Sequence, residues 1–326
     1  MKKVYITGGA GYVGAVLVPK LLGKNYEVSV IDLMIYGEDV LPNHPKLNII
    51  KGDIRDEELL KKTIPGHDVI IHLACISNDP SFELNPDLGK SINLDAFEPM
   101  VKIAQEAKVQ RFIYASSSSV YGIKEVQNVT EDMKCEPLTD YSRFKADCEK
   151  ILANYQSDDF TTVTIRPATV CGYSPRLRLD LTVNILTNHA VNKNEITVFG
   201  GGQKRPNIHI DDISDYYIKL IEIPKELIAG KIFNAGYENH SVMEIANMVK
   251  KVIGKQVNII TTPTDDNRSY HISSDKIKKE LGLEPNHSIE DAVKDLKKAF
   301  EDGLIPNSFS DIKYFNVKLM QAINLQ

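Results

Sequence analysis

Residues 7–14 read TGGAGYVG, and they follow directly on a short β-branched run at residues 3–7. Gly9, Gly11 and Gly14 satisfy the pattern GxGxxG, and the amphipathic stretch at residues 12–24 predicts a helix. Glycines at these places let the backbone turn tightly and approach a pyrophosphate, which the free N–H groups at the helix start then bind. A plain strand–helix turn is the alternative. The strand before the motif and the helix after it favour a dinucleotide site.

Asp32 supplies the second part of that site. It ends the next strand-like run, residues 27–32, and lies 18 residues beyond Gly14. This spacing fits a carboxylate that accepts hydrogen bonds from both hydroxyls of an adenosine ribose. A 2′-phosphate would face that carboxylate, and no Lys or Arg lies between Asp32 and Lys46 to offset the repulsion. The sequence therefore predicts NAD rather than NADP as the cofactor.

Asp53, in the segment KGDIRD, follows the third strand-like run and has two interpretations. Its carboxylate is placed to accept a hydrogen bond from the adenine amino group. Alternatively it is an acid near a helix N-terminus, ahead of Asp56, Glu57 and Glu58. The residues leave both interpretations open.

Strand-like and helix-like segments alternate through the first half of the chain. The predicted strands are residues 3–7, 27–32, 47–50, 68–74, 110–116 and 161–166, and the predicted helices are 12–24, 56–62, 87–107 and 141–155. This alternation indicates βαβ units, and apolar runs such as VIIHLA and RFIYA fit strands buried on both faces. The predicted fold class is α/β, a doubly wound parallel (Rossmann) sheet with a smaller α/β substrate-binding domain. We expect residues 1–166 with 203–235 to form the NAD-binding domain, and 167–202 with 236–326 to form the second.

Composition narrows the class of protein. The 326 residues are 42% hydrophobic and 25% charged, which is ample for a large buried core. A net charge of −5 provides no broad basic surface for nucleic acid or anionic lipid, and no apolar run is long enough to cross a bilayer. The four cysteines show no CxxC spacing, and glycines interrupt the N-terminus where a signal peptide is apolar. We expect a cytoplasmic protein without nucleic-acid or membrane partners.

The segment YSRFK places Tyr141 and Lys145 four residues apart, on one face of a predicted helix. A free phenol titrates near about 10, and a neighbouring cation brings it into a working range for proton transfer. Upstream, Ser116 to Ser119 end a predicted strand, where a hydroxyl could bind a substrate oxygen. A solvated helix face and a serine loop are the ordinary alternatives. Both segments, however, follow strands at the edge where such sheets bind ligands.

Two other chemistries find little support in the sequence. The eight histidines are scattered, without an HxxxH or HxH pair, so we predict no metal site. Acyl transfer by a serine nucleophile lacks a GxSxG segment.

Taken together, these pieces resemble the extended short-chain dehydrogenases/reductases, specifically the sugar-nucleotide epimerase/dehydratase family that includes UDP-galactose 4-epimerase. The matching segments occur in the family's order over most of the chain: TGGAGYVG, Asp32, GDIRD, HLA at 72–74, SSSSVYG, YSRFK, IRP at 165–167 and RPNIHIDD at 205–212. The resemblance implies NAD as cofactor, a nucleotide-diphosphate sugar as substrate and a homodimer.

The resemblance also implies roles for single residues. Tyr141 would be the acid/base, Lys145 would hold the ribose and tune Tyr141, and Ser117 would be the hydroxyl near the sugar. The implied cofactor-binding set is Gly8, Gly11, Tyr12, Val13, Gly14, Asp32, Asp53, Ile54, Leu73, Ala74, Asn93, Tyr141, Lys145 and Pro167. The implied substrate-binding set is Ser77, Ser118, Thr169, Arg176, Arg178, Arg205 and Arg268. Arg205 matches the family's diphosphate-binding arginine, and for each arginine a surface ion pair is the alternative.

Departures from the family pattern bear on the reaction. Dehydratases of the family carry an Asp–Glu pair directly after the active hydroxyl, and this chain has Ser118 and Ser119 there. Epimerases often carry asparagine where this chain has Thr169, and the segment CGYSPRLRLD is similar to that of heptose-nucleotide 4-dehydrogenases. We therefore predict an NAD-dependent sugar-nucleotide 4-epimerase. The alternatives follow in order: a 4-dehydrogenase or reductase, a 4,6-dehydratase and, last, a non-catalytic NAD-binding scaffold.

Overall fold

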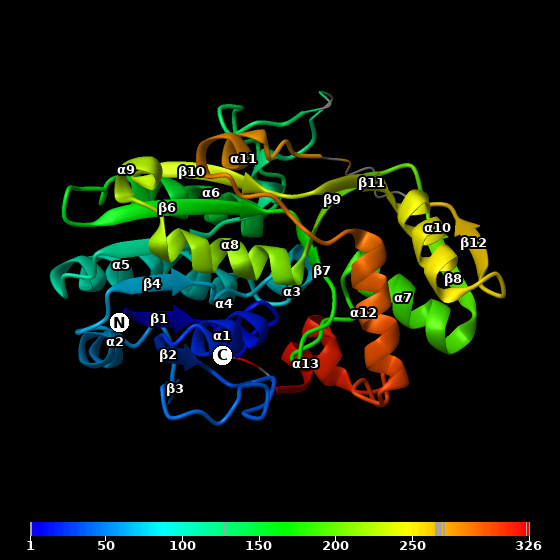
Figure 1. Cartoon of the computed structure of the whole chain (residues 1–326), viewed down its shortest axis with the longest axis horizontal. Coiled ribbons are helices and arrows are strands. Elements are labelled where there is room, and N and C mark those ends of the chain that lie inside the picture. Colours follow the sequence, from blue (N-terminus) through cyan, green and yellow to red (C-terminus); the bar gives the residue numbers. More distant parts are fainter. Residues whose placement is uncertain are drawn as a thin grey trace.

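The computed structural model describes residues 2–124, 126, 128–264, 269, 271–323 and 325. Within these residues the central sheet has seven strands, all parallel, in the order β10-β6-β5-β4-β1-β2-β3 (Figure 1). They are β1 (Lys3–Thr7), β2 (Glu27–Asp32), β3 (Leu47–Lys51), β4 (Val69–His72), β5 (Arg111–Ala115), β6 (Thr161–Pro167) and β10 (Lys231–Ala235). This confirms the predicted doubly wound sheet. The strand order reverses between β1 and β4, where such folds bind ligands.

Helices cover both faces of the sheet because its strands are apolar on both sides. In β1, Val4 and Ile6 enter one core and Tyr5 enters the other. The first core lies under α1 (Gly14–Gly23) and α8 (Ile210–Glu222), which pack against each other. The second lies under α2 (Glu57–Thr63), α5 (Phe97–Glu106) and α6 (Asp140–Ala153). Shorter helices complete the layers: α3 (Asp79–Phe82), α4 (Pro86–Lys90), α9 (Lys225–Ile228) and α11 (Asp275–Leu281).

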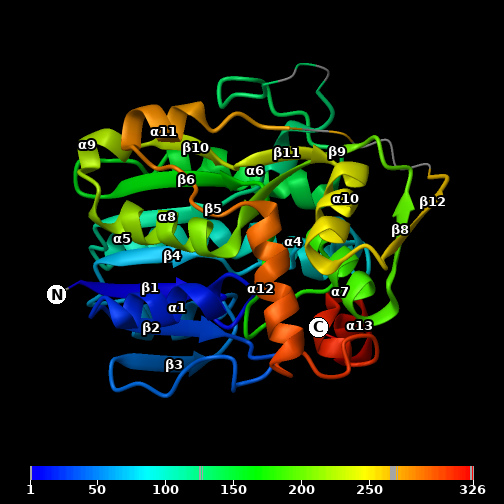
Figure 2. The ribbon, with the colours of Figure 1, turned by 45° about the vertical axis from the view of Figure 1, so that its right-hand side comes forward.

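A smaller region lies at the carboxyl end of the parallel strands (Figure 2). Its strands form two small sheets, β11-β9-β7 and β12-β8. Their bounds are β7 (Thr169–Cys171), β8 (Glu195–Phe199), β9 (Lys204–His209), β11 (Glu238–Ser241) and β12 (Asn258–Thr262). Helices α7 (Thr182–Lys193), α10 (Val242–Ile253) and α12 (Ile289–Glu301) pack together around a separate apolar core. The predicted division into two domains stays a prediction.

The end of the chain returns to the carboxyl edge of the sheet. After η3 (Ile312–Tyr314), α13 (Asn316–Ile323) packs against α3 (Figure 1). Among the described residues, no helix has both the length and the apolar character that crossing a membrane requires.

The prediction of one continuous helix over residues 87–107 is wrong. The segment divides into α4, a π-helical turn η1 (Ser91–Asp95) and α5. The wide turn places the side chain of Asn93 inward, where its amide exchanges hydrogen bonds with the backbone N–H and C=O of Ile76 at 2.8 and 2.9 Å. The π-helical turn thus interrupts the regular α-helix, and the hydrogen bonds of Asn93 to Ile76 fix the loop that follows β4.

His72, at the end of β4, is a buried neutral histidine. Its Nδ1 lies 2.7 Å from the hydroxyl of Thr7, and the rings of Phe97, Phe112 and Tyr114 surround it. Burial and, to a smaller extent, the charge of Lys145 together lower the pKa of His72 to about 3. The imidazole therefore stays uncharged in the folded protein.

This burial predicts a loss of stability in mild acid. Below a pH of about 6.5 the unfolded chain protonates His72 and the folded chain does not, so the free energy of unfolding falls as pH falls. Between about pH 6.5 and about pH 5 we expect His72 to contribute a loss of about 2 kcal/mol. Urea unfolding of the wild type and of His72→Asn at several pH values measures it. Equal pH dependence in the two proteins would contradict this prediction.

Candidate active site

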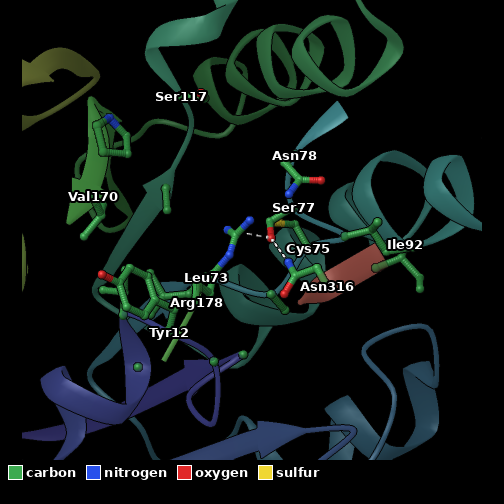
Figure 3. A pocket seen from close by; sticks show the side chains of 18 of the residues that line it. Tyr12, Leu73, Cys75, Ser77, Asn78, Ile92, Ser117, Val170, Arg178 and Asn316 are labelled. Carbon is green, nitrogen blue, oxygen red and sulfur yellow. Dashed lines mark hydrogen bonds between the residues drawn. The ribbon is translucent and has the colours of Figure 1, made fainter. Parts of the chain in front are cut away.

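One cavity lies at the switch point of the sheet and contains most of the predicted site residues (Figure 3). Of those residues the following line it: Gly8, Gly11, Tyr12, Val13, Gly14, Asp32, Asp53, Ile54, Leu73, Ala74, Ser77, Ser117, Ser118, Tyr141, Lys145, Pro167, Thr169, Arg176 and Arg178. They come from the ends of β1, β2, β3, β4, β5 and β6, from α6, from β7 and from the segment that follows β7. Parallel strands end at one edge, so this gathering follows from the topology.

At two positions of the glycine loop the surrounding backbone leaves no room for a side chain. Gly8 has φ +72°, and a Cβ there would lie 2.6 Å from the backbone nitrogen of Ala74. A Cβ on Gly14 would lie 2.3 Å from the carbonyl oxygen of Gly9. The close packing of this turn places the first N–H groups of α1 in the cavity wall, a donor set that fits a pyrophosphate.

Asp32 is held by the backbone on both of its oxygens. Oδ2 accepts from the N–H of Ala10 at 3.0 Å and Oδ1 accepts from the N–H of Met34 at 2.9 Å. Burial raises the pKa of Asp32, and these two N–H groups and the charge of Arg176 work against that rise. Each oxygen keeps a lone pair for a ribose hydroxyl. Asp53 also lines the cavity, but it forms an ion pair with Arg55, with 2.7 Å between Nη2 and Oδ2.

Tyr141, Lys145 and Ser117 lie close together in the lining of the cavity. Nζ of Lys145 donates to the carbonyl oxygen of Ala115 at 2.7 Å and lies 6.0 Å from the centroid of the Tyr141 ring. The hydroxyl of Ser117 lies 2.9 Å from that of Ser119, which fixes the turn after β5. The three predicted groups therefore share one corner of the cavity.

The groups around Tyr141 shift the pKa of its phenol in opposite directions. Burial raises the pKa of the phenol well above its usual value, and the negative charges of Cys75 and Asp79 add to the rise. The positive charge of Arg178 and the hydroxyl of Ser117 lower it. Nearby positive charge, of which Arg178 is one source, therefore favours the phenolate form of Tyr141.

A buried ion pair fixes the helix that carries Tyr141 and Lys145. Glu149, further along α6, accepts from Nε and Nη2 of Arg166 in β6 at 3.0 and 2.6 Å. The hydroxyl of Ser116 also donates to Glu149, and Nη1 of Arg166 donates to the hydroxyl of Tyr121 at 2.7 Å. Both charged side chains are about 5% exposed or less. The pair joins α6 to the ends of β5 and β6.

The segment after β7 brings two arginines into the cavity. Nη1 of Arg178 donates to the hydroxyl of Ser77 at 3.2 Å, and its Nε donates to Asp180 at 2.9 Å (Figure 3). Asn316, from the C-terminal segment, also donates to Ser77, at 3.0 Å. Burial opposes the charge of Arg178, but Asp180 more than compensates and raises its pKa.

Two predicted residues are not found among the described residues that line this cavity. Among the described lining residues Asn93 is not found, because its amide is engaged with Ile76. Arg205, on β9, is also not found in that lining. Arg268 lies outside the described residues. The binding roles of all three stay predictions.

Comparison with known proteins shows the family to which the chain belongs. A sequence model described as the NAD dependent epimerase/dehydratase family matches residues 4–236, more than half of its length. The chain belongs to this family. NAD is therefore its cofactor, and the N–H groups of the glycine loop and the ammonium group of Lys145, as donors, together with the carboxylate of Asp32, as acceptor, form a set that suits it. The family name covers both epimerisation and dehydration, so membership leaves the reaction open.

Individual relatives agree with this placement. A UDP-glucose 4-epimerase of Lactobacillus helveticus is 27% identical, over 89% of this chain and 94% of its own. The structure of a UDP-glucose 4-epimerase from Thermotoga maritima with UDP-glucose has a TM-score of 0.84 at 23% identity, covering 93% of this chain and 99% of that one. A UDP-glucuronic acid 4-epimerase from Bacillus cereus, in complex with UDP-glucuronic acid and NAD, has a TM-score of 0.81 at 26% identity, covering 92% and 99%.

Several lining residues of this family member were missed by sequence reasoning: Tyr36, Asn78, Asp79, Asn316, Met320 and Leu325. Tyr36 lies four residues beyond Asp32, and this short separation in sequence could have identified it as a lining residue. Asp79 is the one carboxylate of the described lining whose charge acts on Tyr141. The C-terminal residues gave no local signal, because only the folded chain brings them to the cavity.

One cluster outside the cavity has the composition of a metal site. His209, Asp211 and Asp295 place one ligand atom each within 4.8 Å of one another, in the described part of the chain. Nδ1 of His209, however, accepts from the backbone N–H of Asp211 at 3.1 Å. The ring proton of neutral His209 therefore lies on Nε2, which leaves that nitrogen without a lone pair for a metal.

The buried pair predicts a large effect of one mutation in α6. Glu149→Ala leaves Arg166 buried without its carboxylate, and we expect a loss of about 3–5 kcal/mol in the free energy of unfolding. Asp147→Ala in the same helix removes an exposed pair with Lys150 and should cost less than about 1 kcal/mol. Urea unfolding of both variants measures the difference. Similar losses for the two would show that the buried pair has no special role.

Proposed function

We propose that this chain is an NAD-dependent nucleotide-sugar 4-epimerase that oxidises carbon 4 of the sugar transiently. The observation that carries the proposal is the meeting of Tyr141, Lys145 and Ser117 in the same cavity as the glycine loop and Asp32. A proton acceptor beside a nicotinamide site is what oxidation of a secondary alcohol requires. The similarity to UDP-glucose 4-epimerases over most of the chain supports the same reaction.

In this mechanism Tyr141 takes the proton from the sugar 4-hydroxyl, and Ser117 hydrogen-bonds the same oxygen. The glycine loop, Asp32 and Lys145 would hold NAD, which would supply a reversible hydride acceptor for carbon 4 of the sugar. Lys145 and Arg178 supply the positive charge that stabilises the phenolate, against the burial that raises the pKa of Tyr141. Tyr141 finally donates its proton back to the oxygen, so the reaction is balanced within one substrate.

The acids available in the cavity favour epimerisation over 4,6-dehydration. Elimination of water needs an additional acid and base near the sugar. The carboxylates of the described lining are Asp32, Asp53 and Asp79, and only Asp79 lies close enough to act on Tyr141. Oδ1 of Asp79 accepts from the hydroxyl of Thr139 at 2.6 Å. Ser118 occupies the wall where the resemblance places a dehydratase carboxylate.

A 4-dehydrogenase is the second candidate, and one observation favours it. The segment similar to that of heptose-nucleotide 4-dehydrogenases contributes both Arg176 and Arg178 to the cavity wall. Incubation with UDP-, GDP-, CDP- and dTDP-sugars separates the two reactions. A 4-epimer by NMR without accumulated NADH supports the epimerase. Stoichiometric NADH with a keto sugar supports the dehydrogenase instead.

The acid/base assignment predicts the behaviour of Tyr141→Phe. Turnover should fall by at least about 100-fold, because no other described group at that position can exchange the proton. The affinity for NAD should stay within about twofold of the wild type, because the glycine loop and Asp32 are untouched. Steady-state assays and calorimetric titration with NAD measure the two effects. Retained turnover would remove Tyr141 from the mechanism.

The position of Arg178 predicts a change in the pH profile. Its charge lowers the pKa of Tyr141, so Arg178→Gln should raise that pKa and move the rising limb of kcat/KM to higher pH. Profiles from about pH 6 to about pH 10 measure the shift. Arg178→Lys keeps a positive charge and should shift the limb less. A higher KM with an unmoved profile would mean that Arg178 binds substrate without tuning Tyr141.

A further inference from the structure

Arg176 is a buried cation that its protein partners satisfy only in part. Its side chain is 4% exposed and lines the cavity. Nη2 donates to Oδ1 of Asn316, and Cζ lies 3.4 Å from the centroid of the Tyr36 ring. Nε and Nη1 have no hydrogen-bond partner among the described residues. Buried donors of a charged group are normally paired, so two open N–H groups in a cavity wall indicate a site for an anion.

The surroundings of Arg176 place that anion at the adenosine end of the cavity. The ring of Tyr36, which contacts Arg176, belongs to the segment that follows Asp32 at the end of β2. The charge of Arg176 also lowers the pKa of Asp32, against the rise that burial causes. Arg178, two residues further on, donates to Ser77 and acts on Tyr141 instead. The two guanidinium groups therefore have different polar partners, and Asn316 lies between them, accepting from Arg176 and donating to Ser77.

The backbone that carries Arg176 is fastened to the glycine loop. The hydroxyl of Ser174 donates to the carbonyl oxygen of Tyr12 at 2.8 Å, and the hydroxyl of Tyr12 donates to the carbonyl oxygen of Gly172 at 2.6 Å. All four of these groups are buried. Any phosphate held by the glycine loop thus has a fixed position relative to Arg176.

We propose that Arg176 binds the pyrophosphate of the dinucleotide rather than the substrate diphosphate, and that Asn316 holds it in place from the C-terminal segment. A guanidinium presents N–H groups in a planar fork that matches phosphate oxygens. The start of α1 brings the pyrophosphate to this end of the cavity. The inference rests on dinucleotide binding and is independent of the 4-epimerase reaction.

ADP-ribose, which contains the adenosine and pyrophosphate of the cofactor but no nicotinamide, is the probe that tests this. In the full-length chain freed of copurified nucleotide, Arg176→Met should weaken ADP-ribose binding about 10- to 100-fold by calorimetry. Arg143→Met, a control at an exposed arginine of α6 outside the described cavity lining, should leave it within about threefold of the wild type. Unchanged affinity in Arg176→Met, or an equal loss in both variants, would overturn the proposal.

The unfolding temperature gives a second readout that a structural role would not produce. Met removes a buried charge whose donors are unpaired, so ligand-free Arg176→Met should unfold at the same temperature as the wild type or higher. ADP-ribose should then raise that temperature less than in the wild type. A lower unfolding temperature with wild-type ADP-ribose affinity would instead identify Arg176 as a structural residue.

A further test uses Asn316→Ala, a variant that keeps Arg176. Removing the amide should weaken ADP-ribose binding several-fold, and unchanged affinity would count against the proposal if Arg176→Met does not fold. Failure of every sugar nucleotide to react would overturn the 4-epimerase reaction and leave these binding measurements valid.

Discussion

The ion pair between Arg166 and Glu149 is the contact on which the reacting corner of the cavity depends. It is buried, it is bidentate, and it joins the strand β6 to the helix α6. Two charges in an apolar interior stabilise a fold only if their geometry is good and their remaining hydrogen bonds are made. Ser116 and Tyr121 make those bonds here. The helix is therefore fixed in rotation as well as position, which a purely apolar contact would define less sharply.

A second set of buried polar contacts joins the two regions of the fold across the cavity. The side-chain amide of Asn184, on α7, donates to the hydroxyl of Tyr12 at 2.9 Å and to the carbonyl oxygen of Arg178 at 2.9 Å. Its Oδ1 accepts from the N–H of Gly172 at 3.0 Å. One side chain thus fixes the glycine loop and the arginine segment together. The cavity has two walls from distant parts of the chain, and this amide sets the distance between them.

The sequence predicted what depends on local pattern. Spacings of a few residues indicate the glycine motif, the parallel direction of the strands and the pairing of Tyr141 with Lys145. The strands predicted at residues 3–7 and 27–32 agree with β1 and β2. The π-helical turn at Asn93 was not predictable, because its cause is a contact with Ile76 from another segment. Asn316 was missed for the same reason, since its partners Ser77 and Asp180 are distant in sequence.

The choice between returning and releasing the hydride is a question about how the cavity opens. An epimerase returns the hydride to the same sugar and never needs to release its dinucleotide, whereas a dehydrogenase must exchange or reoxidise it. In this chain the C-terminal segment contributes Asn316, Met320 and Leu325 to the described lining of the cavity, and Asn316 contacts Arg176, Ser77 and Asp180 at once. Opening for cofactor exchange breaks all three contacts together and leaves a buried guanidinium with fewer partners. We expect this cost to slow release of the dinucleotide, in keeping with the proposed reaction, in which the cofactor stays bound.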